Sequence, residues 1–203
     1  MSLSERQARL FFEPLAGKTT AFRLDGRPSN LKFASAILRL LAGARLGCRF
    51  LDLDAFYSSN LEALAVGVPR ENLAGLEMTL LDPGSEIEAA LAALLLDGED
   101  RPLVIDSANS LYQLLSVRNP RAASRKFAFF VSVLSSWAKS NGEPAMASIY
   151  DRRPVARRRA SRSLADAFDN SISVSAKRDG LAFRCERGSA WRAGGFFLPF
   201  EGR

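Results

Sequence analysis

The chain has 203 residues, 47% of them hydrophobic and 25% charged, and its 28 Lys and Arg residues against 22 Asp and Glu give a net charge of +6. This composition is typical of one globular domain with a core that needs no disulfide or metal. Because the chain has no histidine and its two cysteines lie far apart, it excludes a Cys–His nucleophile and argues against a zinc site.

The excess of basic residues favours a polyanionic partner, although the same charge also serves solubility. No apolar run reaches the ~20 residues that a membrane-spanning helix needs. The first residues also lack the apolar stretch of a signal peptide. We therefore expect a cytoplasmic protein without a membrane partner.

Residues 1–17 are expected to form an N-terminal arm, followed by a single domain over 18–203. The arm carries Phe11, Phe12 and Leu15, which must be buried somewhere. Two alternatives follow. The segment packs on the core of its own chain, or it docks on another copy or on a partner protein.

The next residues predict a strand at 20–24, a turn and a helix at 31–45. Compared with the phosphate-binding pattern G-x-x-x-x-G-K-[ST], this unit keeps Gly26 and Lys32 but has Leu31 and Phe33 in place of the second Gly and the Ser/Thr. A Gly at the position of Leu31 would let the backbone surround the phosphates, and a hydroxyl at the position of Phe33 would bind Mg²⁺. A nucleotide pocket here would be degenerate, and Lys32 is otherwise a solvated helix residue.

The remaining patterns indicate a mostly parallel α/β sheet that ends in antiparallel hairpins. Strands are predicted at 48–53, 76–81, 103–105 and 145–150, and helices at 56–66, 86–96 and 127–139. From Ser171 onward, the pattern changes to hairpin strands at 172–176, 181–187 and 195–200.

The strand at 103–105 has no polar alternation, which is typical of a central parallel strand covered on both faces. Asp106 and Ser107 follow at its carboxyl end, the edge where open α/β sheets bind ligands. An Asp at this place holds Mg²⁺ in P-loop nucleotidases. The alternative is that Asp106 only caps the next turn.

Two basic segments follow strands of the predicted sheet. Arginine is favoured over lysine in both, which suits phosphate binding, and both are expected at the same sheet edge. A solvated loop is the alternative. Because Tyr150 and Phe168 are the only nearby aromatic residues, we expect little sequence specificity. The candidate DNA-binding residues are Arg152, Arg153, Arg157, Arg158, Arg159 and Arg162, with Arg118, Arg121, Arg125 and Lys126.

The order of these parts resembles the ATPase core of the RecA/RadA recombinase superfamily. Residues 103–112, Leu-Val-Ile-Asp-Ser-Ala-Asn-Ser-Leu-Tyr, look like its Walker B strand, and 50–56, Phe-Leu-Asp-Leu-Asp-Ala-Phe, are similar to the segment with the catalytic Glu. Asp54 stands in place of that Glu and is one methylene shorter. The resemblance implies a RecA-like fold with a degenerate nucleotide pocket made of Gly26, Lys32, Asp54, Asp106 and Ser107.

The function implied is that of a non-catalytic RecA/RadA paralogue, archaeal by family analogy, with no cofactor, metal or catalytic residue. It would bind DNA through the two basic segments, as the family does through two loops. It would then assist homologous recombination or DNA repair, alone or with a RecA/RadA-type recombinase. One alternative is a structural subunit of a ring or hetero-oligomer that acts through protein contacts or RNA binding. Another is a weak ATPase.

Overall fold

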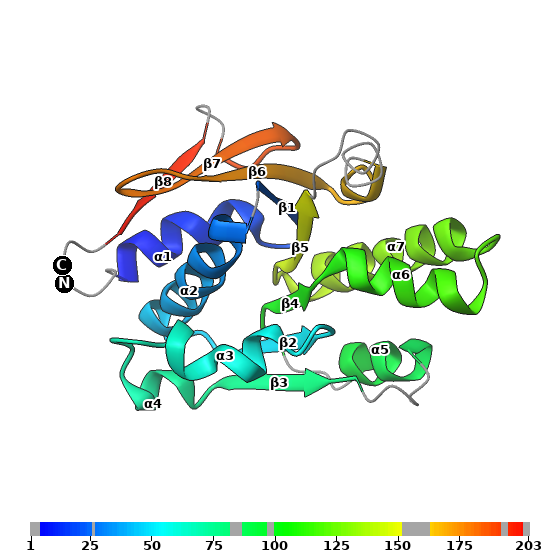
Figure 1. Ribbon diagram of the computed structural model, residues 1–203, viewed down its shortest axis with the longest axis horizontal. Helices are drawn as coiled ribbons and strands as arrows, with labels where there is room; N and C mark the ends of the chain where they lie inside the picture. The colour runs from blue at the N-terminus through cyan, green and yellow to red at the C-terminus, as the bar shows by residue number, and fades with distance from the viewer. Residues whose placement is uncertain are drawn as a thin grey trace.

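The protein is described here from a computed structural model that covers residues 5–25, 27–81, 87–96, 100–151, 163–191 and 195–200. Within these residues one eight-stranded sheet has the order β3-β2-β4-β5-β1-β6-β7-β8 (Figure 1). Neighbouring strands pair in parallel from β3 to β6, whereas β7 and β8 add antiparallel pairs. The strands are β1 Thr19–Asp25, β2 Cys48–Asp52, β3 Leu76–Leu80, β4 Leu103–Asp106, β5 Ala145–Asp151, β6 Asn170–Ala176, β7 Gly180–Arg187 and β8 Phe196–Pro199.

Helices cover both faces of the sheet, and the alternation of side chains along β1 separates two cores. Phe22 and Leu24 pack with α1 and α2, whereas Ala21 packs with α7 on the opposite face. The helices are α1 Glu5–Phe12, α2 Arg27–Ala44, α3 Phe56–Leu64, α4 Arg70–Leu73, α5 Ile87–Leu96, α6 Ala108–Arg118 and α7 Ala123–Asn141, and η1 Glu13–Leu15 is a 3-10 turn.

Each predicted strand is present, with ends shifted by at most two residues. The helix α6 was not predicted, because Asn109, Ser110 and Ser116 give its sequence the polar character of a loop. In the fold these polar side chains are only half-buried, and Leu111 and Leu115 on the apolar face are buried in the core. The helix is therefore stabilised mainly by tertiary packing of that face.

The N-terminal helix packs on its own chain. Phe11 and Leu15 are fully buried, and the Phe11 ring centroid lies 5.2 Å from that of Phe183 and 6.0 Å from that of Phe22. The alternative in which Phe11, Phe12 and Leu15 dock on another copy or a partner is therefore wrong. Among the described helices, none combines the length and the hydrophobicity needed to cross a bilayer.

Candidate functional site

The candidate site lies at the carboxyl edge of three neighbouring parallel strands, β2, β4 and β5. Asp52 ends β2, Asp106 ends β4, and these two residues pair in register. Ser148 and Tyr150, two residues apart on β5, add side chains to the same edge. Since parallel strands end at the same edge, polar residues from distant parts of the sequence meet here.

Asp106 is buried in a hydrogen-bonded cluster. It is 1% exposed, and its Oδ1 accepts hydrogen bonds from the Ser148 hydroxyl and, at 2.5 Å, from the Tyr150 hydroxyl. Its Oδ2 is buried without a hydrogen-bond partner. Burial raises the pKa of Asp106 to about 6, against the two hydrogen bonds, which lower it. The alternative that Asp106 caps the next turn is wrong, because its carboxyl group faces β5.

Ser107 is the residue that caps the next turn. Its Oγ accepts a hydrogen bond from the Ser110 N–H at 3.2 Å and thereby starts α6. Asp54 supports this cap, since its carboxylate accepts hydrogen bonds from the hydroxyls of Ser110 at 2.7 Å and Ser107 at 3.3 Å. Asp52 accepts from the backbone N–H groups of Phe56 and Ser58 and so holds the start of α3. Asp106, Asp54 and Asp52 therefore hydrogen-bond with three different elements, β5, α6 and α3 respectively.

The sequence did not indicate that α6 is tied to β5. The Tyr150 N–H donates to Asn109 Oδ1 at 2.7 Å, and Asn109 Nδ2 donates back to the Tyr150 carbonyl at 3.5 Å. These two hydrogen bonds join the start of α6 to the end of β5 beside the site. They involve only the backbone of Tyr150, so the identity of that residue gives no sequence signal for them.

The structure places the expected phosphate-binding lysine away from this cluster. β1 ends at Asp25 and α2 begins at Arg27, so Lys32 is already the sixth residue of a helix. Its ammonium lies 4.8 Å from the centroid of the Phe200 ring. Phe33 is buried with its ring centroid 5.1 Å from that of Phe22. Gly26 lies outside the described residues.

The expected nucleotide pocket is thus brought together only in part. Asp54, Asp106 and Ser107 meet, but Lys32 makes its described contact with the segment after β8. A phosphate-binding loop needs successive backbone N–H groups outside a helix to surround the phosphates. Here the residues before Lys32 are helical, which leaves those groups in the first turns of α2. In the described part of the chain, no cluster of three or more acidic or cysteine side chains is arranged to hold a metal ion.

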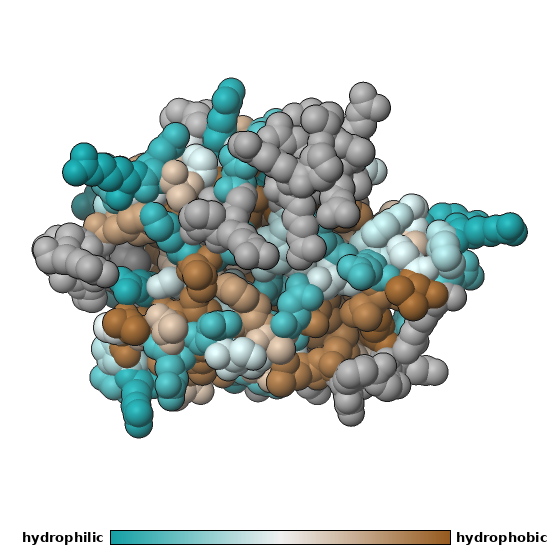
Figure 2. Space-filling view, viewed as in Figure 1, coloured by the Kyte–Doolittle hydropathy of each residue, from teal (hydrophilic) through white to brown (hydrophobic). Residues whose placement is uncertain are grey.

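The second basic segment lies at the turn between α6 and α7. Arg121 and Arg125 are exposed, whereas the Lys126 ammonium forms an ion pair with Glu88 at 2.8 Å. Figure 2 shows hydrophilic side chains at the right-hand end of the molecule, where Figure 1 places this turn. The side chain of Arg118 is not described, and the six arginines at 152–162 lie outside the described residues.

The described residues on both sides of the arginine segment fix where it starts and returns. It leaves the sheet at the end of β5, where Tyr150 is bonded to Asn109 of α6. It returns at residues 163–168, where Phe168 is buried with its ring centroid 6.3 Å from that of Phe127 in α7. Both ends are therefore held against α6 and α7, the two helices that carry the other basic segment.

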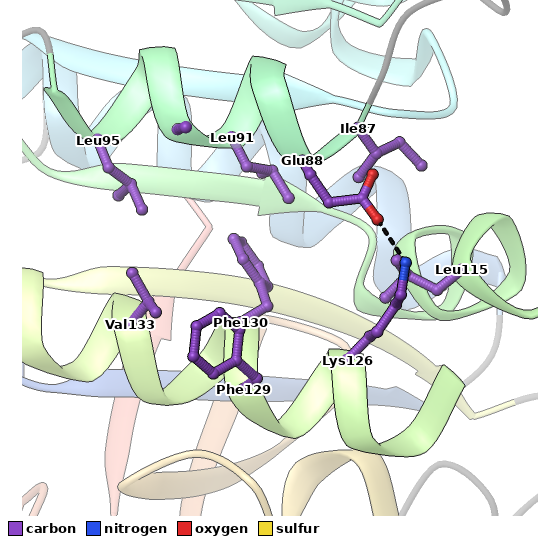
Figure 3. Close-up of a pocket in the computed structure, with 10 residues that line it drawn as sticks. Ile87, Glu88, Leu91, Leu95, Leu115, Lys126, Phe129, Phe130 and Val133 are labelled. Atoms are coloured by element: carbon purple, nitrogen blue, oxygen red, sulfur yellow. Dashed lines mark hydrogen bonds and ion pairs between the residues drawn. The ribbon is translucent and has the colours of Figure 1, made fainter. Parts of the chain in front are cut away.

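A separate apolar groove of about 360 Å³ lies between α5 and α7. Figure 3 shows Leu91 and Leu95 of α5 opposite Phe130 and Val133 of α7, with the Glu88–Lys126 ion pair at one end. Phe129, which also lines the groove, is 72% exposed. An apolar groove of this kind is typical of a surface that meets another molecule.

Comparison with known proteins identifies the fold. No family model matches the sequence, and no curated protein matches it either. Among solved structures, the chain is similar to the crystal structure of the RadB recombinase, with a TM-score of 0.66 and 15% sequence identity over 92% of this chain and 88% of that chain. The predicted RecA-like fold, a mostly parallel sheet with C-terminal antiparallel hairpins, is confirmed.

Proposed function

We propose that this RecA-like protein binds DNA without hydrolysing ATP and assists homologous recombination or repair, alone or with a recombinase partner. The DNA-binding surface is formed by the arginine segment at 152–162 together with Arg121 and Arg125. The likeness to RadB recombinase supports a role in recombination. The helical backbone before Lys32 supports the absence of ATP hydrolysis, since it offers no loop to surround phosphates.

One observation carries the DNA-binding proposal. The described residues that flank the arginine segment contact these helices: Tyr150 is bonded to Asn109 of α6, and the Phe168 ring lies against Phe127 of α7, the helix that also carries the exposed Arg125. Six arginines within residues 152–162 of the sequence repel one another unless an anion screens them. Polynucleotide phosphate supplies that anion and accepts bidentate hydrogen bonds from arginine.

The test is a triple variant, Arg157→Ala with Arg158→Ala and Arg159→Ala, in a DNA-binding titration at several salt concentrations. If Z phosphates are neutralised, log K falls with log salt at a slope of about −0.9Z on duplex and about −0.7Z on single strands. The variant should bind unrelated sequences more weakly and with a flatter slope. Its melting temperature should not change much, because the segment adds little to the core.

The control is a variant of equal charge on the other side of the molecule, with Arg6, Arg9 and Arg70 changed to Ala. These exposed arginines lie on α1 and α4. If both triple variants lower affinity equally, net charge alone accounts for binding. If neither lowers it, the arginine segment is a solvated loop and the proposal is wrong.

A structural subunit that acts through protein contacts is the second candidate, favoured by the apolar groove between α5 and α7. It predicts self-association or capture of a recombinase that is lost in Phe129→Asp, measured by light scattering. A monomer at all concentrations, with no recombinase bound, would speak against it.

A further inference from the structure

Among the described residues, the hairpin strands β6, β7 and β8 have one face covered by α1 and α2 and an opposite, open face that carries exposed side chains. On the covered face, Val174, Phe183 and Leu198 are buried with the α1 and α2 layer. Because side chains alternate along a strand, the residues between them point to the opposite face. The main contacts of α6 and α7 are with β1 and β5 rather than with β7 or β8. The open face carries Ser173, Ser175, Ala182, Arg184 and Phe197.

The aromatic ring of Phe197 lies on this face and packs over Gly180. It pairs with Ala182 and is 46% exposed, although it belongs to a paired strand. A Cβ atom at Gly180 would lie 2.6 Å from Cζ of the Phe197 ring and would also meet the Leu198 carbonyl oxygen. The glycine therefore leaves the space that the ring occupies. An aromatic ring that rests on a sheet and keeps much of its surface exposed can stack a nucleic-acid base.

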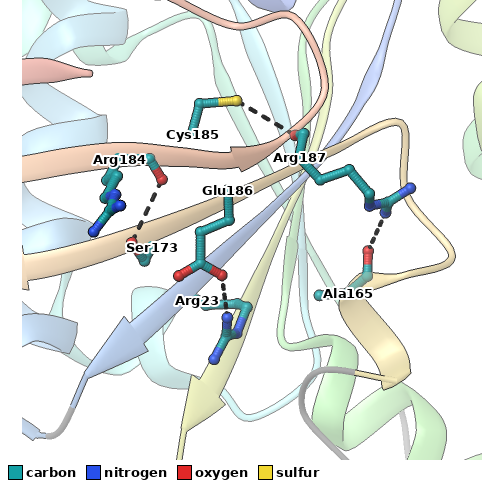
Figure 4. Close-up of polar contacts among 7 residues, drawn as sticks. All are labelled: Arg23, Ala165, Ser173, Arg184, Cys185, Glu186 and Arg187. Atoms are coloured by element: carbon teal, nitrogen blue, oxygen red, sulfur yellow. Dashed lines mark hydrogen bonds and ion pairs between the residues drawn. The ribbon is translucent and has the colours of Figure 1, made fainter. Parts of the chain in front are cut away.

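The charge around Phe197 fits a polyanion. Lys177, Arg178 and Arg184 are exposed on the same hairpin. Glu186 does not neutralise Arg184, because its carboxylate forms an ion pair with Arg23 of β1. Figure 4 shows the Arg184 guanidinium apart from that pair, and the Ser173 hydroxyl donates to the backbone carbonyl of Arg184. An exposed arginine on the same sheet face as an exposed ring can bind the phosphate next to a stacked base.

We infer that the open face of β6 to β8 binds single-stranded nucleic acid, with a base stacked on Phe197 and the neighbouring phosphate held by Arg184. The inference rests on the proposed function, in which the arginine segment binds the same polynucleotide. A duplex keeps its bases stacked on one another, so this face distinguishes single strands from duplex. DNA and RNA share the stacking and phosphate chemistry.

The test compares Phe197→Ala with Phe197→Trp in fluorescence anisotropy titrations on labelled oligothymidine, oligouridine and a DNA duplex. Loss of one stacking contact should weaken single-strand binding roughly 5- to 100-fold in Phe197→Ala, whereas Phe197→Trp retains it. The salt slope should be unchanged in Phe197→Ala, since no charge is removed. In Arg184→Ala it should become shallower by about 0.7, the value for one single-strand phosphate.

Leu10→Ala, which removes another half-exposed apolar side chain (51% exposed) from α1, is the control and should bind like the wild type. Oligothymidine and oligouridine report whether the strand bound is DNA or RNA. Unchanged single-strand affinity in a folded Phe197→Ala protein would overturn the inference, and so would an equal loss on duplex. In both cases the arginine variant still tests the proposed function. A wild-type protein that binds none of the three probes would overturn both.

Discussion

At the scale of single residues, Asp106 is the unusual group of this fold. Its carboxyl group is 1% exposed, and this burial raises its pKa to about 6 although Ser148 and Tyr150 both donate to it. Its Oδ2 has no hydrogen-bond partner. A carboxyl proton would relieve the charge that burial disfavours. Asp106 therefore makes the stability of the protein depend on pH.

The first prediction concerns Asp106→Asn. Because the folded pKa of about 6 lies above the ordinary Asp value of 3.8, the native state binds the proton more tightly. The stability from this group is complete below about pH 4 and is lost as pH rises to about 6. Asn stays neutral, so the variant should be more stable than wild type at pH 7.5 by up to about 3 kcal/mol. Near pH 4 this advantage should vanish.

Urea unfolding of both proteins at several pH values measures this difference. Asp54→Asn, a change at the exposed carboxylate of the same edge, is the control. A stability difference that is independent of pH would contradict the argument.

The second prediction concerns the Tyr150 hydroxyl. Its hydrogen bond lowers the pKa of Asp106, so Tyr150→Phe leaves a buried charge with one donor fewer. The variant should lose about 1–3 kcal/mol at pH 7.5. In an Asp106→Asn background the loss should be smaller, because the amide carries no charge. Chemical unfolding of the four proteins in this cycle gives the coupling, and purely additive effects would contradict it.

At the scale of elements, α1 belongs to the core although its sequence also suits a docking arm. The helix lies along α2, and Phe11 contacts aromatic residues of β1, β7 and β8 (Figure 1). The helix α1 thus covers the antiparallel end of the sheet together with α2. Removal of this helix would expose the aromatic core around Phe183.

The third prediction follows for α1. Phe11→Ala should lower the free energy of unfolding by about 3–5 kcal/mol, the usual cost of truncating a buried phenylalanine. Leu10→Ala, one residue away but 51% exposed, should change it by less than about 0.5 kcal/mol. Thermal or urea unfolding checks both variants. Equal effects would mean that the helix does not pack as described.

At the scale of the whole molecule, a RecA-like fold is combined with a helix α2 that begins at Arg27, two residues after the end of β1 at Asp25. The acidic residues at the carboxyl edge form a hydrogen-bonded cluster that joins β2, β4, β5, α3 and α6. Among the described basic residues of the second segment, Arg121 is exposed between α6 and α7, and Arg125 is exposed in the first turn of α7.

The fourth prediction concerns nucleotide. ATP with Mg²⁺ should neither raise the melting temperature nor change DNA affinity, since Lys32 lies on a formed helix beside Phe200. Thermal shift and phosphate release measure this directly. Turnover that disappears in both Lys32→Ala and Asp106→Asn would show a working ATPase and would contradict the proposal.

The sequence by itself determined the strands along the chain and the acidic residues at the ends of two of them, because apolar periodicity and strand-end residues are local signals. Tertiary structure decided what those residues contact. Ser148 and Tyr150 reach Asp106 only because β5 lies beside β4, and the Lys32 ammonium lies over the Phe200 ring, which follows β8. The open face with Phe197 exists only after β8 pairs with β7. Contacts between distant residues depend on strand pairing and helix packing, which no local pattern records.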